Sequence, residues 1–267
     1  MIIIGEKING TRKAVKEAIL AGNRSYIEKI ALEQAEAGAD YLDVNAGTNP
    51  DRETKDMLWL LDIVQSVTDV PVCIDSSSEE TLKAALENVK RLPMVNSINA
   101  DDRRLKSFLP IIKEKECPVI ALALDESKSG MPKSTEERLE NISKIFLQTR
   151  KAGIPDENVF VDPLIMSVST DINACLEALS CIRTIREQYP QARITGGLSN
   201  ISFGLPKREL VNRTFLTLAM SAGMDSAVCD PSNTAFIESL KATDMLLGRD
   251  RFCRAYTTAA KRGFDKK

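Results

Sequence analysis

The chain has 267 residues, of which 43% are hydrophobic and 28% are charged, and a chain of this kind can bury a large core without a disulfide or metal staple. Its 36 Lys and Arg residues nearly balance its 38 Asp and Glu residues, which argues against nucleic acid or a membrane surface as a partner. The sequence contains no His. We therefore exclude Ser-His-Asp and Cys-His mechanisms within one chain, and the usual zinc site.

Short runs rich in Val, Ile and Leu recur along the chain and are typical of parallel strands that are buried on both faces. The eight predicted strands are Ile2–Ile4, Tyr41–Val44, Val72–Ile74, Met94–Asn96, Val119–Leu124, Val159–Val161, Arg193–Thr195 and Ser226–Val228.

An amphipathic pattern follows each of these runs and predicts a helix. The eight predicted helices are Ser25–Ala37, Thr54–Ser66, Leu82–Val89, Leu105–Lys115, Ser134–Lys151, Ile172–Tyr189, Arg208–Ala222 and Asn233–Leu247. Gly38, Gly153 and Gly223 follow the ends of three of them and are expected to stop those helices.

Eight strands, each followed by a helix, predict a (β/α)8 barrel of the α/β class with about 33 residues per unit. An open doubly wound sheet is the alternative, although such sheets usually have fewer strands. The sequence contains neither the glycine fingerprint of dinucleotide-binding folds nor a P-loop. No linker is visible, so we expect a single domain over residues 1–267.

The six cysteines form no C-x-x-C pair. Cys73, Cys117 and Cys229 lie in or beside apolar runs and are expected to be small core residues. The sequence shows no disulfide framework, no secretory leader and no apolar run of membrane-spanning length. These features predict a cytoplasmic location.

Acidic and amide residues mark the ends of the predicted strands, where a barrel of this kind carries its active site. They are Asp43, Asn45, Asp75, Asn96, Asn99, Asp125, Asp162, Asn200 and Asp230. Any one of them could be a helix cap, and Ser76–Ser78 before Glu79 fits a cap well. Caps alone do not explain why so many strands end in this way.

The ring of strand-end residues fits two kinds of ligand. A magnesium ion could be held by Asp43, Asp75 and Asp162. A flat, nitrogen-rich heterocycle could use the same groups, because carboxylates accept paired N–H bonds and amides match adjacent donors and acceptors. A Schiff-base aldolase is disfavoured, because no predicted strand contains a Lys; Lys7 lies just past the first strand.

Seven segments at these positions resemble the pterin-binding methyltransferases, and most closely the methyltetrahydrofolate:corrinoid protein methyltransferases. They occur in the same order and span essentially the whole chain. The segments are Ile4–Gly10, Leu42–Asn45, Ile74–Ser76, Asn96–Ala100, Asp162–Leu164, Gly197–Asn200 and Asn212–Phe215.

The resemblance implies a dihydropteroate-synthase-like TIM barrel, usually a homodimer, that binds the pterin of tetrahydrofolate at its mouth. It implies transfer of a methyl group between N5 of the folate, as 5-methyltetrahydrofolate, and the cobalt of a corrinoid carried by a partner protein. By position, the residues expected to bind the folate are Asp75, Asn96, Asp162, Gly196, Ser199, Asn200 and Arg208. Among them, Asn200 matches the residue that hydrogen-bonds N5, and we expect Asn200, Asp75 and Asp162 to act in catalysis. No metal ion bound by this chain itself is expected.

The residue types suit this chemistry. An amide does not ionise in this range, so Asn200 can act only through a hydrogen bond whose strength changes in the transition state. The proton would reach N5 from solvent or through a water held by Asp75 or Asp162. The loop Asp125–Pro132 is a candidate contact for the corrinoid protein.

Three alternatives belong beside this interpretation. Dihydropteroate synthase shares the barrel, but its resemblance implies an Arg-His pair late in the chain, where this sequence reads Ala227–Asp230. A demethylase component would run the transfer toward tetrahydrofolate, and the residues do not set the direction because one active site catalyses both. A non-catalytic folate-binding protein would bind the pterin without turnover.

Overall fold

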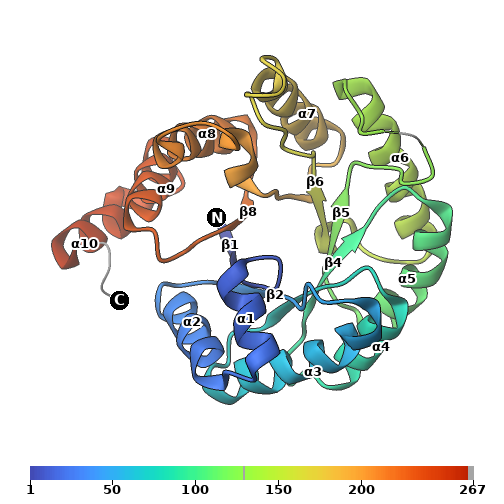
Figure 1. Ribbon diagram of the computed structural model, residues 1–267. Coiled ribbons are helices and arrows are strands. Elements are labelled where there is room, and N and C mark those ends of the chain that lie inside the picture. The colour runs from blue at the N-terminus through green and yellow to red at the C-terminus, as the bar shows by residue number, and fades with distance from the viewer. Residues whose placement is uncertain (129, 264–267) are drawn as a thin grey trace.

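Eight parallel strands form a barrel at the centre of the computed structural model, which describes residues 1–128 and 130–263 (Figure 1). The strands are β1 (Ile2–Asn9), β2 (Tyr41–Asn45), β3 (Val72–Asp75), β4 (Met94–Ile98), β5 (Val119–Leu122), β6 (Val159–Asp162), β7 (Arg193–Ile194) and β8 (Ser226–Cys229). They pair in the order β7-β6-β5-β4-β3-β2-β1-β8. All eight predicted strands are confirmed.

The barrel closes between β7 and β8, which are the two ends of that order. The N–H of Val228 donates to the carbonyl of Gly196 at 3.0 Å, and Gly197 forms an isolated parallel bridge with Val228. A further bond runs from the Asp225 N–H to the Ile194 carbonyl at 3.3 Å. The sheet therefore closes on itself, and the open doubly wound alternative is wrong.

Each strand differs by at least one residue from its predicted bounds, and β1 and β5 show the reasons. β1 continues to Asn9, well past the predicted end at Ile4, because Asn9 still pairs with Asn45 of β2 after a register shift between Gly5 and Ile8. β5 ends at Leu122 because the N–H of Leu124 turns back to the Leu122 carbonyl at 2.7 Å and leaves the ladder. The extension of β1 carries polar residues to the mouth of the barrel.

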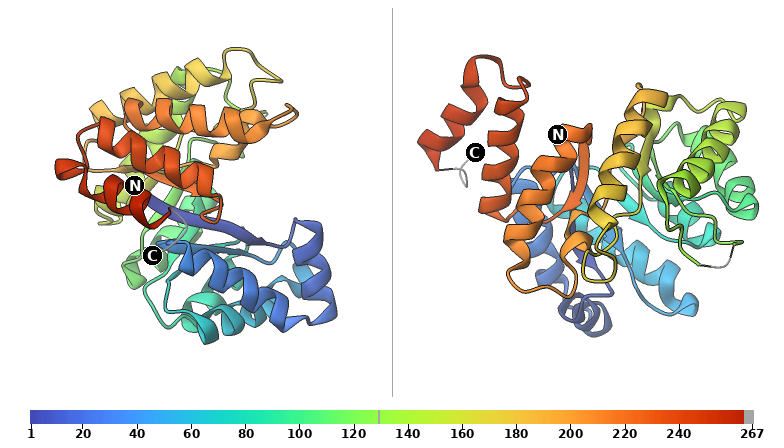
Figure 2. Two further views of the ribbon diagram at one scale, coloured as in Figure 1. Left: turned by 90° about the vertical axis from the view of Figure 1, so that its left-hand side faces the viewer. Right: turned by 90° about the horizontal axis from the view of Figure 1, so that it is seen from above.

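Helices surround the barrel and link its strands (Figures 1 and 2). They are α1 (Lys13–Ala21), α2 (Arg24–Glu36), α3 (Pro50–Val67), α4 (Glu79–Glu87), α5 (Asp102–Lys115), α6 (Thr135–Lys151), α7 (Ala174–Gln188), α8 (Arg208–Ala222), α9 (Thr234–Leu246) and α10 (Arg254–Arg262), with 3-10 turns at Asp156–Asn158, Leu198–Ser202 and Arg251–Cys253. All eight predicted helices are confirmed.

The prediction missed α1 and α10. α1 is only nine residues long, and its N-cap residue Arg12 makes no side-chain cap bond, so it lacks a clear start signal. The residues of α10 are mostly exposed, so they give little apolar pattern. The predicted glycine stops are confirmed: Gly38, Gly153 and Gly223 all have positive φ beyond their helices.

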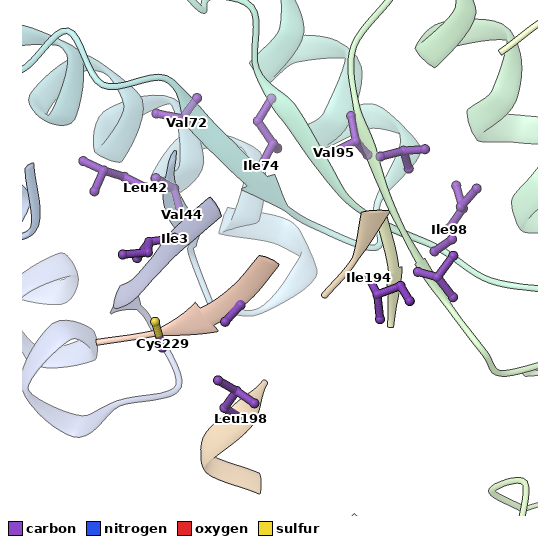
Figure 3. Close-up of a cluster of buried hydrophobic side chains, with 14 of the residues drawn as sticks. Ile3, Leu42, Val44, Val72, Ile74, Val95, Ile98, Ile194, Leu198 and Cys229 are labelled. Atoms are coloured by element: carbon purple, nitrogen blue, oxygen red, sulfur yellow. The ribbon is translucent and has the colours of Figure 1, made fainter. Parts of the chain in front are cut away.

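Side chains alternate between the inside of the barrel and the layer under the helices. Outward-facing residues such as Leu42, Val44, Val72 and Ile74 pack with the helices in the main core (Figure 3). A second, smaller cluster fills the barrel, and its buried members are Ile4, Cys73, Met94, Ile120 and Phe160. The interior of the barrel is therefore a packed core, and the acids Asp75 and Asp162 stand at the carboxyl ends of their strands.

All six cysteines are free, and Cys73, Cys117 and Cys229 are buried as predicted. Within the described residues, no helix is both long enough and apolar enough to cross a membrane. Residue 129 of the candidate partner loop and residues 264–267 of the predicted domain lie outside the described residues.

Candidate functional site

A pocket of about 240 Å³ opens at the carboxyl ends of the barrel strands. It brings together four of the predicted site residues: Asp75 from β3, Asn96 from β4, Asp162 from β6 and Asn200 from the turn after β7. The complete lining is Glu6, Asn9, Arg12, Asp43, Asp75, Asn96, Ile120, Asp162, Gly197, Asn200 and Val228. The polar groups stand around the apolar side chains of Ile120 and Val228, an arrangement that suits a flat ring with polar edges.

Two amide–carboxyl pairs order one side of the pocket. The Asn45 amide donates to Oδ2 of Asp75 at 2.8 Å, and the Asn96 amide donates to Oδ1 of Asp43 at 3.0 Å. Each pair joins neighbouring or next-neighbouring strands, so the barrel itself sets the spacing. The pairs fix the orientation of both amides and leave acceptor positions for a ligand.

Asp162 stands on the opposite side and is held by backbone donors. Its Oδ1 accepts the N–H of Leu164 at 2.8 Å, and the Gly197 N–H also bonds to this carboxyl group. Gly196 is buried behind it, where a Cβ would lie 3.3 Å from Asp162 Oδ1 and 2.8 Å from the end of the Ile165 side chain. Gly196 lines neither pocket at the mouth, so it shapes the site by leaving room for Asp162.

The pocket disfavours negative charge on its own carboxyl groups. Burial raises the pKa of Asp162 to about 6. Burial, followed by the nearby Asp75, raises the pKa of Asp43 to about 8. The pKa of Asp75 is also raised by burial, and that of Glu6 is raised by burial against the opposing effect of Arg12. A ligand that brings N–H donors would relieve this cost, and perturbed acids in a cleft are typical of functional sites.

Asn200 differs from the acids because its side chain is exposed at the rim. In the described part of the structure its side-chain amide makes no hydrogen bond to the protein, and its nitrogen lies only 3.1 Å from where a Cβ on Gly197 would be. The backbone N–H of Asn200 bonds to the Gly197 carbonyl at 3.1 Å. The turn therefore fixes the backbone while the amide remains available to a ligand.

Ser199 and Arg208 line an adjoining pocket of about 260 Å³. This second pocket shares Glu6 and Arg12 with the first. Arg208 donates to the Ser199 carbonyl at 2.7 Å and so ties the start of α8 to the turn that carries Asn200. Two of the predicted folate residues are thus placed beside the first pocket rather than in it.

Four polar lining residues were not among the predicted site residues: Glu6, Asn9, Arg12 and Asp43. Asp43 was visible as a strand-end acid and was considered as a ligand for magnesium or for a flat heterocycle, but it was not placed among the folate-binding residues. The other three lie on or just after the part of β1 that the apolar pattern did not reach. A signal did exist for Glu6, because it stands two residues after the inward-facing Ile4.

Other strand-end residues serve local structure. Asp125 is buried outside both pockets, where Ser127 and Lys144 bind its carboxylate. Ser78 caps α4 as expected, whereas the Ser76 hydroxyl donates to Glu53. Among the described residues, no group of three or more Cys, Asp or Glu side chains is arranged to hold a metal ion.

Comparisons with known proteins show what the chain as a whole is similar to. Residues 5–230 match the family model described as pterin binding enzyme. The chain is 41% identical over 263 residues to the methylcorrinoid:tetrahydrofolate methyltransferase of Eubacterium limosum, covering 98% of this chain and 97% of that protein. It is 28% identical over 245 residues to the methionine synthase of Mycobacterium leprae, covering 87% of this chain but only 20% of that much longer protein.

Solved dihydropteroate synthases share the fold. The enzyme of Clostridium difficile, determined in the presence of pteroic acid, superposes with a TM-score of 0.71 at 17% identity, covering 92% of this chain and 96% of that one. The enzyme of Coxiella burnetii, in complex with pteroic acid, gives 0.70 at 16% identity, covering 93% and 94%. At these identities the likeness shows the barrel alone. Together with the match over residues 5–230, the full-length relative places this chain in the pterin-binding enzyme family.

Proposed function

We propose that this protein is a methyltransferase that moves a methyl group between N5 of tetrahydrofolate and the cobalt of a corrinoid carried by a separate protein. The observation that carries the proposal is the convergence of Asp75, Asn96, Asp162 and Asn200 on one pocket at the barrel mouth. The relative of nearly equal length supports it, because that protein is a methylcorrinoid:tetrahydrofolate methyltransferase.

The pocket suits the pterin ring of folate. Asp75 and Asp162 both line it and can accept N–H donors from the ring edge, and Asn96 can offer both a donor and an acceptor. The apolar side chains of Ile120 and Val228 provide contact for the ring itself. The adjoining pocket, with Ser199 and Arg208, shares the lining residues Glu6 and Arg12 with the first, and we assign it to the rest of the folate.

Asn200 is the residue that acts on N5. Positive charge or a proton is present at N5 when its bond to the methyl group breaks or forms, and a hydrogen bond that strengthens at that moment lowers the barrier. The exposed amide is free to take either donor or acceptor orientation. The cobalt of the partner supplies the nucleophile when it is in its reduced state, which explains how a chain without His can perform the transfer.

Asp162 and Asp75 hold the water that exchanges the N5 proton with solvent. The raised pKa of Asp162, about 6, lies closer to neutrality than that of an ordinary carboxyl group, and this favours proton transfer in both directions. A corrinoid on another protein must approach N5 closely, and the exposure of Asn200 at the rim leaves that path open. The loop Asp125–Pro132 is the contact that we assign to the partner, and we further propose a homodimer in the cytoplasm.

The decisive experiment mixes the protein with free cob(I)alamin and 5-methyltetrahydrofolate and follows the formation of methylcobalamin in the visible spectrum. Methylcobalamin with tetrahydrofolate tests the reverse direction. We expect Asn200→Ala to lower the single-turnover rate by about 10²–10³, the usual loss for one transition-state donor. Asn173→Ala is the matched control, because Asn173 is an exposed amide that lines neither pocket.

The possible outcomes distinguish a methyltransferase from a folate-binding protein without turnover. A spectral change in either direction that slows with Asn200→Ala supports the methyltransferase. A change that proceeds at the wild-type rate in the variant contradicts the role of Asn200. Tight folate binding with no spectral change in either direction contradicts the transfer and supports a folate-binding protein without turnover.

A further inference from the structure

Asp43 is the most deeply placed carboxyl group of the pocket. It lies on β2 between Leu42 and Val44, which pack in the main core under the helices (Figure 3). Because side chains alternate along a strand, that of Asp43 points into the barrel. Only 3% of the residue is exposed, and the ion pairs found among the described residues do not include it. A carboxyl group in this position has no cation to compensate its charge.

The groups around Asp43 are acids, an amide and the Cys73 thiol, which forms a hydrogen bond with it. Asp75 and Cys73 face it from β3, and Glu6 faces it from β1, where Arg12 neutralises Glu6 through a 2.8 Å ion pair. From β4 the Asn96 amide donates to it at 3.0 Å. Its neighbours therefore add negative rather than positive potential.

Ionising both Asp43 and Asp75 costs free energy, because like charges in a buried site oppose each other. Asp75 has the better support for a charge, since the Asn45 amide donates to its Oδ2 at 2.8 Å and the residue borders the open pocket. Burial and the charge of Asp75 raise the pKa of Asp43 to about 8. One proton shared by the pair thus rests on Asp43 at neutral pH.

We propose that Asp43 is a positioning residue of the folate site: it remains protonated beneath Asp75 and fixes the Asn96 amide in the orientation that the pterin meets. This inference rests on the proposed function for the identity of the ligand. The bond to Asp43 consumes one hydrogen of the Asn96 amide, so its oxygen and second hydrogen remain for the ring. The neutral Asp43 leaves Asp75 as the single carboxylate on that side.

Ligand binding and the proton on Asp43 are coupled. A bound pterin would exclude water from the pocket and make ionisation of Asp43 still less favourable. The protonated state therefore binds the ligand more tightly, and the affinity falls as the pH rises above about 8. Loss of one proton limits the fall to about tenfold per pH unit.

Infrared spectroscopy of the protein without ligand tests the proton directly. The wild type should show the carbonyl stretch of a protonated carboxylic acid that disappears between about pH 7 and about pH 9. Asp43→Asn should lack this signal. Asp125→Asn should retain it, because the carboxylate of Asp125 is bound by Ser127 and Lys144 outside the pocket.

Affinity for 5-methyltetrahydrofolate, measured by calorimetry over the same pH range, tests the positioning role. Asp43→Asn should bind with no step near pH 8, because an amide keeps an oxygen for Asn96 but cannot ionise. Asp43→Val should bind roughly tenfold to a hundredfold more weakly at pH 7, since the Asn96 donor loses its partner. Titration of the ligand itself appears equally in every variant and so cancels in the comparison.

The results distinguish failure of this inference from failure of the proposed function. If the infrared signal is absent in the wild type or survives in Asp43→Asn, Asp43 does not hold the proton. Identical pH profiles for the wild type and Asp43→Asn also overturn the inference. If 5-methyltetrahydrofolate does not bind at all, the proposed function fails, while the infrared result still decides the state of Asp43.

Discussion

Asp162→Asn should make the protein more stable at neutral pH while it weakens ligand binding. The folded-state pKa of Asp162 is about 6, compared with about 3.9 for an unperturbed Asp. Below about pH 4 the carboxyl group is protonated in both the folded and the unfolded chain, so its contribution to stability is fully present. As the pH rises through about 6 that contribution is lost, because the unfolded chain ionises at no such cost.

The size of the loss follows from the shift. Roughly two pKa units at 1.36 kcal/mol each give about 3 kcal/mol, an upper bound because the pocket side of Asp162 meets water. The amide in Asp162→Asn can still accept the Leu164 N–H through its oxygen, the 2.8 Å bond of the wild type. The variant should therefore match the wild type near pH 4 and exceed it by up to about 3 kcal/mol near pH 7.

Urea unfolding at the two pH values measures this difference through the midpoint and slope. Affinity for 5-methyltetrahydrofolate should fall about tenfold or more in the same variant, because the amide turns an N–H donor toward the donors of the ring. Such a gain in stability with a loss of function is typical of a functional site.

Asp125, whose pKa is shifted in the opposite direction, provides the control for Asp162→Asn. Burial alone would raise the pKa of Asp125, but hydrogen bonds from Ser127 and the charge of Lys144 outweigh it and lower that pKa. Asp125→Asn should therefore reduce stability at pH 7, where the bound carboxylate is lost. The reasoning is refuted if Asp162→Asn is less stable than the wild type at pH 7, or if its gain is the same at both pH values.

Two further predictions concern glycines beside the site. Gly10→Ala should destabilise the fold by about 3 kcal/mol or more in urea unfolding, because the new Cβ would lie 1.7 Å from the Ala46 carbonyl oxygen. The control is Gly22→Ala, which should cost only about 1 kcal/mol because Gly22 has a φ of 64° but open space around it. Equal losses of stability in the two variants would contradict the close approach of Gly10 to Ala46. Gly196→Ala should lower the affinity for 5-methyltetrahydrofolate, measured by calorimetry, about tenfold, because the new Cβ would press on Ile165 and on the carboxyl group of Asp162. An unchanged affinity would show that the pocket does not depend on this contact.

The sequence determined the architecture because the signals involved are local. A buried parallel strand reads as a short apolar run wherever it stands in the chain, and the helix that follows carries its own amphipathic pattern. Since every strand of such a barrel points the same way, the acids and amides at the strand ends could be assigned to one rim without coordinates. Asp75, Asn96, Asp162 and Asn200 do line one pocket.

Only the tertiary structure decided how deeply each site residue is buried, which carboxyl groups are charged and which of the two pockets each residue lines. Asp43 and Asn96 are 53 residues apart in the sequence and meet only because β2 and β4 both border β3. Glu6 reaches the mouth of the barrel because β1 continues its pairing with β2 beyond the apolar run. Arg208 lines the adjoining pocket because α8 starts beside the turn that carries Asn200. Burial and Coulomb energy depend on neighbours from distant segments, so no local pattern could show which carboxyl group keeps its proton.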